Sequence, residues 1–136
     1  MRTVFTSLAL SLLLVGCKAS NPATPTGPAA EAPNAEAAAE AAMSEISVED
    51  ADKALQSGAM AFDANSERTR TKYGTVPGAV ILTSSSKYEL SQLPDDKTKD
   101  LIFYCSNTFC TASDNAAERA SANGYENVHI MREGIK

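Results

Sequence analysis

The sequence predicts an α/β domain in which helices cover both faces of a small parallel sheet. Short apolar segments that suit buried strands recur from residue 59 onward, at 59–62, 79–82, 101–104 and 128–131. Parallel strands buried on both faces appear as continuous apolar runs, and helical crossovers connect them. The polar residues 66–78, between the first two strands, are expected to form a loop that ends in the turn residues 73–78 (YGTVPG).

Three helices are expected around these strands. The first begins after Ser47, which stands in capping-box spacing with Asp50, and ends before Gly58. The other two are a short helix at 86–93 and a longer one at 111–122. Alanines give the longer helix a face of small side chains, which suits close packing on a sheet. Apolar strands that alternate with helices in this way favour a parallel sheet over an antiparallel one.

The first residues have the features of a secretory signal. Arg2 supplies a positive start, residues 4–15 form an apolar run of 12 residues, and small Gly16 precedes Cys17. The run is too short for a membrane-spanning helix, which needs about 20 residues. The LVGC ending resembles a bacterial lipobox, in which the cysteine is acylated and becomes the first residue of the mature protein. We therefore expect a signal peptide at 1–16 and lipidation at Cys17; an ordinary signal with an incidental cysteine is the alternative.

Residues 17–43 are expected to be a disordered linker between the lipid anchor and the domain. From 18 to 42 the chain has no Val, Ile, Leu or aromatic residue, and it holds four of the six prolines. Such a stretch cannot bury enough apolar surface to offset the entropy of ordering it. In Gram-negative lipoproteins, Asp directly after the lipidated cysteine resembles an inner-membrane retention signal. This chain has Lys18 at that position, so the predicted location is the outer membrane, facing the periplasm. The domain is assigned to 44–136.

Composition excludes some classes of function. The chain has 136 residues, 12 Lys and Arg against 17 Asp and Glu, and a formal charge of −5, with nothing resembling a basic patch for nucleic acid. Two of the three cysteines and the distant His129 do not make a recognisable zinc set. We predict neither a metal nor a cofactor.

The chemistry is expected at the loop that follows the third strand. Cys105 and Cys110 bracket this loop, which leads into the start of a helix. Ligands of parallel sheets bind beyond the carboxyl ends of the strands, and helix amino termini favour anions. A thiol placed there has an increased thiolate fraction, and thiolate is the nucleophile of sulfur chemistry. Asp63 and Asn65 lie at the end of another strand. We expect them either to contact the loop or to stabilise a turn.

Several segments of the chain, taken together with Cys105, resemble the rhodanese-like domain. The resemblance covers about 46–136 and rests on five segments: 62–65 (FDAN), 73–79 (YGTVPGA), 103–105 (FYC), 124–128 (GYENV) and 132–135 (REGI). It implies that Cys105 carries a persulfide, loaded by a sulfur donor and emptied by a thiol acceptor. It also implies that backbone amides of residues 106–111 hold the persulfide anion. The predicted substrate-binding residues are Ser106, Asn107, Thr108, Phe109 and Thr111.

The sequence departs from the family pattern in several places. The loop has no basic residue, and Cys110 stands where many active members carry Arg or Lys, so thiosulfate is expected to be a poor donor. The segment 110–113 (CTAS) looks like a subgroup with a second cysteine in the loop. The family's usual Arg after the first strand is Asn65, and its usual His before the Pro-Gly turn is Thr75. The family usually continues beyond Lys136, so a truncated C-terminal end is expected.

Three hypotheses remain open from the sequence. The first is sulfur transfer through Cys105, with Cys110 as a resolving thiol that displaces the sulfur and forms a disulfide. The second is a thiol–disulfide redox module, because a pair of cysteines in an extracytoplasmic compartment can oxidise. The third is a non-catalytic binding domain that uses the loop to recognise a partner. The expected partners are a sulfur donor, a thiol acceptor and, through the lipid anchor, a membrane.

Overall fold

The computed structural model describes residues 43–136. The predicted signal peptide, the lipidation at Cys17 and almost all of the predicted linker lie outside these residues. Within them, no helix is long and apolar enough to cross a membrane.

A five-stranded parallel sheet forms the centre of the domain, as the apolar runs predict. Its strands are β1 (Met43–Glu45), β2 (Met60–Asp63), β3 (Val80–Ile81), β4 (Asp100–Tyr104) and β5 (Asn127–Met131). Their spatial order is β1-β5-β4-β2-β3, so β4 is the central strand. Each neighbouring pair is parallel; Phe62 of β2, for example, lies opposite Phe103 of β4.

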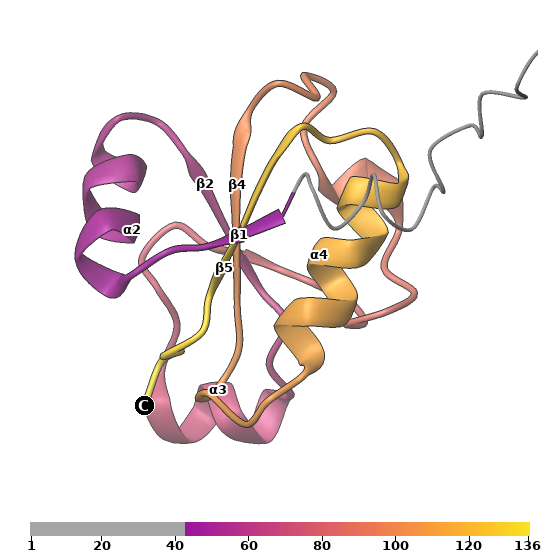
Figure 1. Cartoon of the computed structure of the whole chain (residues 1–136). Coiled ribbons are helices and arrows are strands. Elements are labelled where there is room, and N and C mark those ends of the chain that lie inside the picture. The colour runs from indigo at the N-terminus through magenta and orange to yellow at the C-terminus, as the bar shows by residue number, and fades with distance from the viewer. Residues whose placement is uncertain (1–42) are drawn as a thin grey trace, which may run out of the picture. The chain divides into compact units, whose positions relative to one another are not determined.

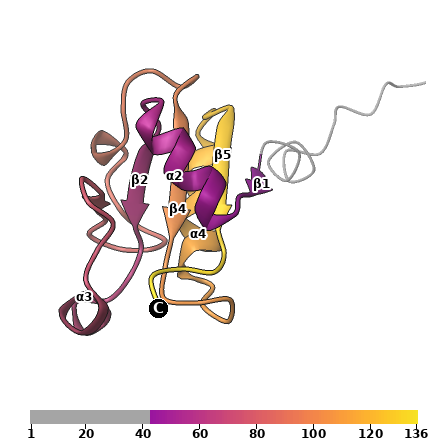
Figure 2. The ribbon, with the colours of Figure 1, turned by 90° about the vertical axis from the view of Figure 1, so that its left-hand side faces the viewer.

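Helices cover both faces of this sheet, which confirms the predicted fold class. Helix α2 (Val48–Gln56) packs on one face, against Ala61, Ile102 and Tyr104. Helix α4 (Ala112–Ala122) packs on the other through its small residues (Ala116, Ala117 and Ala120), beside the stacked rings of Phe62 and Phe103. Figures 1 and 2 show α2 and α4 on opposite sides of the sheet. The start of α2 also agrees with the sequence, since Ser47 caps the helix by accepting a hydrogen bond from the Asp50 amide at 3.1 Å.

Two predictions made between these elements are wrong. Residues 66–78 are not all loop, because Glu67–Tyr73 form a helix, α3, at the carboxyl end of the sheet (Figure 1). The Ser66 hydroxyl caps α3 by accepting from the Thr69 amide at 3.4 Å, and Gly74 ends the helix with a φ of 83°. This helix buries no residue, so it has no apolar periodicity to reveal it.

The helix expected at 86–93 is reduced to one 3-10 turn, Leu90–Gln92. The Ser84 hydroxyl instead accepts the Lys87 amide in a turn, at 3.1 Å. The segment packs by burying Tyr88, whose hydroxyl donates to the Ala116 carbonyl of α4 at 2.8 Å. Arg119 fixes the same segment, because its Nε donates to the Tyr88 carbonyl at 3.0 Å.

Strand β1 is a further addition to the predicted fold. Met43, assigned to the end of the linker, pairs with Val128 of β5 at the edge of the sheet. Arg132 ties this edge to α4, since it forms ion pairs with Glu45 at 2.5 Å and with Asp114 at 2.9 Å. These carboxylates raise the pKa of the Arg132 guanidinium, through the hydrogen bond to Glu45 and then the one to Asp114.

Candidate functional site around the Cys105–Cys110 loop

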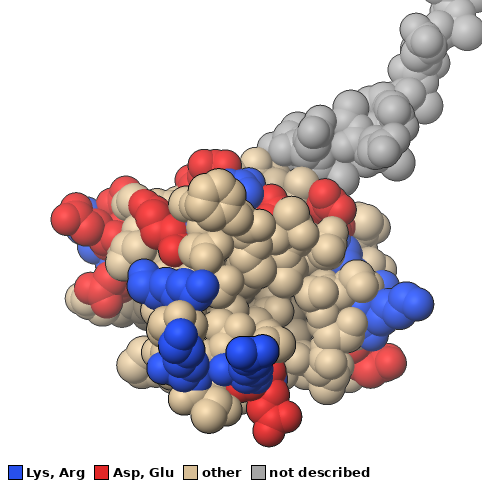
Figure 3. Space-filling model, turned by 90° about the horizontal axis from the view of Figure 1, so that it is seen from below, with Lys and Arg blue, Asp and Glu red and all other residues tan. Residues whose placement is uncertain are grey.

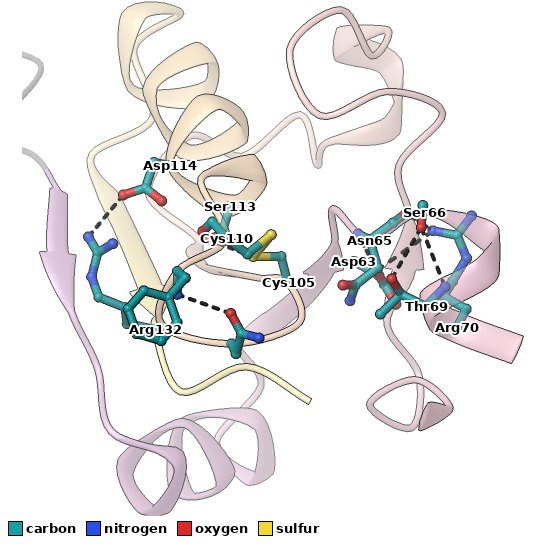
Figure 4. The surroundings of a disulfide bond; sticks show 12 residues. Asp63, Asn65, Ser66, Thr69, Arg70, Cys105, Cys110, Ser113, Asp114 and Arg132 are labelled. Atoms are coloured by element: carbon teal, nitrogen blue, oxygen red, sulfur yellow. Dashed lines mark hydrogen bonds and ion pairs between the residues drawn. A yellow bond between two sulfur atoms is a disulfide. The ribbon is translucent and has the colours of Figure 1, made fainter. Parts of the chain in front are cut away.

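Cys105 is the first residue after the central strand β4, where the sequence places the candidate nucleophile. Its side chain is only 1% exposed. A disulfide joins it to Cys110, which is half-buried, and the two Cα atoms are 6.3 Å apart (Figure 4). The two cysteines that bracket the loop are therefore brought together, in an oxidised state.

The sulfur of Cys105 faces the amino-terminal end of α4. The Ser113 hydroxyl donates a hydrogen bond to Cys105 Sγ at 3.5 Å, and the Cys110 carbonyl oxygen lies 3.2 Å from the same sulfur. Ser113 is buried in the first turn of α4. The sequence alone did not predict a role for Ser113. Ser113 nevertheless precedes Ala116 by three residues and Ala117 by four, which places it on the face of α4 that meets the sheet. That spacing is the signal that identifies it.

Hydrogen bonds within the loop determine its shape. The Asn107 side chain accepts from the Phe109 amide at 3.0 Å, and the Asn107 carbonyl accepts from the Cys110 amide at 3.0 Å. Two of the amides expected to hold a persulfide are thus bonded inside the loop in this oxidised form. The side chain of Phe109 is 93% exposed.

The residues after β5 support the first half of the loop. The Ile135 amide donates to the Cys105 carbonyl at 3.0 Å, and the Lys136 amide donates to the Ser106 carbonyl at 3.2 Å. Gly134 packs against the loop so closely that an added Cβ would lie 2.6 Å from the Cys105 oxygen and the Asn107 nitrogen. This support joins residues that are distant in sequence, so no local pattern predicts it.

The turn after β2 lies beside the loop and is fixed by the buried carboxylate of Asp63. Its Oδ1 accepts from the Asn65 amide at 2.7 Å, and its Oδ2 accepts from the Tyr104 hydroxyl at 2.9 Å. Arg70 of α3 lies 3.7 Å from Oδ1 and also donates to the Asn65 carbonyl. Burial raises the pKa of Tyr104, and the hydrogen bond to Asp63 raises it further. Of the two roles considered for Asp63, the structure gives it the turn-stabilising one.

A pocket of about 370 Å³ lies between this turn and the loop. We call it the Cys110 pocket; it is lined by Ala64, Asn65, Ser66, Thr69, Ser85, Ser106, Cys110 and Ala112. Of the five predicted substrate-binding residues, only Ser106 lines it. Thr108 lines a different hollow, with Arg132, and Thr111 is exposed just before α4. Asn65 lines the pocket although the sequence left its role open.

Metal binding finds no support in residues 43–136, where no group of three or more His, Cys, Asp or Glu side chains is arranged to hold an ion. His129, the one histidine of the chain, is engaged elsewhere. Its Nδ1 is hydrogen-bonded to the Ser44 hydroxyl at 2.8 Å, and its Nε2 lies 3.7 Å from Asp100.

The fold is that of a parallel α/β domain with a buried cysteine at the carboxyl end of its central strand, which is the edge of such sheets where ligands bind. The chain belongs to the rhodanese-like domain family, whose model, described as "Rhodanese-like domain", matches residues 47–136. This family supports a sulfurtransferase-like or related function in general terms. A search among curated proteins gives no match.

Among solved structures, the chain is similar to a protein of unknown function from Rhodopseudomonas palustris CGA009, described as a possible tyrosine phosphatase. The TM-score is 0.54 and the identity 20%, and the alignment covers 85% of this chain and 91% of the other. At this identity the likeness shows the fold alone.

Proposed function

We propose that the protein is a membrane-tethered sulfur-transfer module, in which Cys105 carries a persulfide and Cys110 resolves it. The observation that carries this proposal is the position of Cys105 Sγ, buried after the central strand, next to the Ser113 hydroxyl and within bonding reach of Cys110. A lipid on Cys17 would hold the domain at the outer membrane, facing the periplasm.

The proposed cycle has two steps. In the first, the Cys105 thiolate attacks the outer sulfur of a donor, the donor's S–S bond breaks, and Cys105 is left with a terminal sulfur. In the second, an acceptor thiolate takes that terminal sulfur and regenerates the Cys105 thiolate. Alternatively, the Cys110 thiolate attacks Cys105 Sγ, which forms the Cys105–Cys110 disulfide and releases hydrosulfide. In that branch the transferred sulfur is reduced and two thiols are oxidised.

Two features suit the Cys105 environment to this chemistry. A hydroxyl that donates to sulfur stabilises an anionic thiolate more than a neutral thiol, because hydrogen bonds to charged groups are stronger. Burial excludes water, which strengthens that hydrogen bond. Because the loop carries no cation, an organic persulfide is expected to be a better donor than the dianion thiosulfate.

The test is a sulfur-transfer assay on the reduced full chain, purified in detergent, with thiosulfate, inorganic polysulfide and an organic persulfide as donors. Cys105→Ser should lose transfer to an acceptor thiol by at least about 100-fold, which corresponds to about 2.7 kcal/mol of transition-state stabilisation. Cys110→Ser, the matched control, should keep transfer but release no hydrosulfide in the absence of an acceptor. Transfer that survives in Cys105→Ser contradicts the proposal.

The disulfide itself supports a second candidate, a thiol–disulfide redox module. That activity requires exchange with a dithiol substrate and no sulfur donor. Oxidation of a dithiol peptide by the wild-type protein, with no sulfur uptake from any donor, would favour this candidate. A protein inert in both assays would favour the third hypothesis, a non-catalytic binding domain.

A further inference from the structure

Cys105 shares the amino-terminal end of α4 with a carboxylate. Its Sγ accepts a hydrogen bond from Ser113, and the next residue, Asp114, lies in the same first turn of the helix. Figure 4 shows Ser113 and Asp114 together at this end of α4. The partial positive charge at a helix amino terminus favours an anion, but two anions placed there repel each other. An uncompensated Asp114 carboxylate would therefore oppose the Cys105 thiolate that sulfur transfer requires.

Asp114 depends on one cation for the compensation of its charge. Nη2 of Arg132, the residue after β5, donates to Asp114 Oδ1 at 2.9 Å. The other oxygen, Oδ2, is buried and has no hydrogen-bond partner within residues 43–136. Arg132 also lies beside the cysteine loop, because it lines the same hollow as Thr108. Loss of Arg132 would leave a negative charge next to the helical turn that faces the sulfur.

The other charges around Cys105 are paired or exposed. Asp63, in the turn after β2, pairs with Arg70 of α3 and accepts from the hydroxyl of Tyr104, whose pKa is raised by burial. Solvent screens exposed charges. Figure 3, which views the carboxyl end of the sheet, shows Lys and Arg side chains on the surface there. The exposed charged residues of the surrounding elements include Glu49 and Asp52 on α2, Glu67, Arg68 and Lys72 on α3, Glu118 on α4, and Glu133 and Lys136 after β5.

We propose that Arg132 is a positioning residue for sulfur transfer: by neutralising Asp114, it keeps the amino-terminal end of α4 favourable to the Cys105 thiolate. Arg132 acts through Asp114 and not on the reacting sulfur itself. Its second ion pair, to Glu45 of β1 at 2.5 Å, holds the guanidinium from the edge of the sheet. This inference rests on the proposed function, because the thiolate is the form of Cys105 that attacks a sulfur donor.

The test is the pH profile of Cys105 alkylation by iodoacetamide, followed on the Cys105 peptide by mass spectrometry. It uses the reduced full chain in detergent, with Cys110→Ser as the background. Arg132→Gln should raise the midpoint of the profile by about one pH unit, because a nearby like charge disfavours the thiolate. The double variant Arg132→Gln/Asp114→Asn should return the midpoint to that of the background. An unchanged midpoint in Arg132→Gln, or one that stays raised in the double variant, overturns the proposal.

Glu45→Gln is the matched control, since it breaks the other ion pair of Arg132 and leaves Asp114 compensated. It should leave the midpoint unchanged. A rise equal to that of Arg132→Gln would mean that both variants act by loosening the edge of the sheet, which overturns the proposal.

Asp114→Asn alone keeps Arg132 in place, so it tests the same charge if Arg132→Gln does not fold. It should lower the midpoint by about half a pH unit, because it removes an anion from the end of α4 that faces the sulfur. An unchanged or higher midpoint overturns the proposal. These experiments use no sulfur donor, so their failure is distinct from a failure of sulfur transfer, which is measured by transfer to an acceptor thiol.

Discussion

Cys105 and Cys110 share one disulfide but have different surroundings. Cys105 continues the central strand, is buried, and receives a hydrogen bond from Ser113, while the tail after β5 bonds to its carbonyl. Cys110 is half-buried at the far end of the loop, where it lines a pocket. The sheet and α4 hold the first cysteine, and only the loop's own turn holds the second. Under the proposed function the pair divides its work: the buried Cys105 carries the transferred sulfur, and the half-buried Cys110 resolves the persulfide.

The largest expected effect comes from removing the support on the Cys105 side. Gly134→Ala should lower the free energy of unfolding by about 3 kcal/mol, because it adds a left-handed backbone penalty to a clash with the loop. Gly78→Ala is the matched control, since Gly78 has a φ of 78° but nothing within 4 Å of its added Cβ. It should cost only about 1 kcal/mol. Urea denaturation measures both, and equal losses would mean that the tail does not support the loop.

The disulfide should contribute an intermediate amount. Closing a loop between residues 105 and 110 is worth about 2 kcal/mol by restricting the unfolded chain. Urea denaturation of the wild-type protein with and without a reductant measures this difference, and Cys110→Ser should show no response to the reductant. If the wild-type protein is unaffected by reduction, the disulfide does not constrain the fold, and the contrast between the two sulfurs loses its structural basis.

The smallest effect is expected at Ser113. In a Cys110→Ser background, Ser113→Ala should slow the reaction of Cys105 with iodoacetamide about fivefold at neutral pH, equivalent to about 1 kcal/mol. The cause is the loss of the hydroxyl that donates to Cys105 Sγ. Ser121→Ala, which removes another buried hydroxyl of α4 away from the sulfur, serves as the control. Similar rates in the two variants would show that Ser113 only fills space.

The predicted parts of the fold are those whose residues carry their own signal. Leu101–Tyr104 and Val128–Met131 are apolar runs that suit buried strands, and both lie within observed strands. Helix α3 is polar throughout, so only its end residues, Ser66 and Gly74, mark it. Strand β1 has three residues, and its pairing with β5 is a tertiary contact that no local pattern encodes.

The same distinction applies to the candidate site. The Cys105–Cys110 pair was identified from its position between a strand and a helix, although whether it forms a disulfide was not predictable from spacing alone. The contacts of Ser113 and Gly134 with the loop depend on how distant elements pack. The burial of Asn65 Nδ2, which has no hydrogen-bond partner within residues 43–136, is likewise a consequence of packing.

Storage of sulfur on Cys105 is tested most directly by detecting the added sulfur on that residue. Reduced Cys110→Ser is treated with polysulfide, blocked with iodoacetamide, and digested for mass spectrometry. If Cys105 stores the sulfur, the peptide that contains Cys105 gains one sulfur, about 32 Da. An unmodified Cys105 in this variant, under conditions where the wild-type protein transfers sulfur, would show that the sulfur is carried elsewhere.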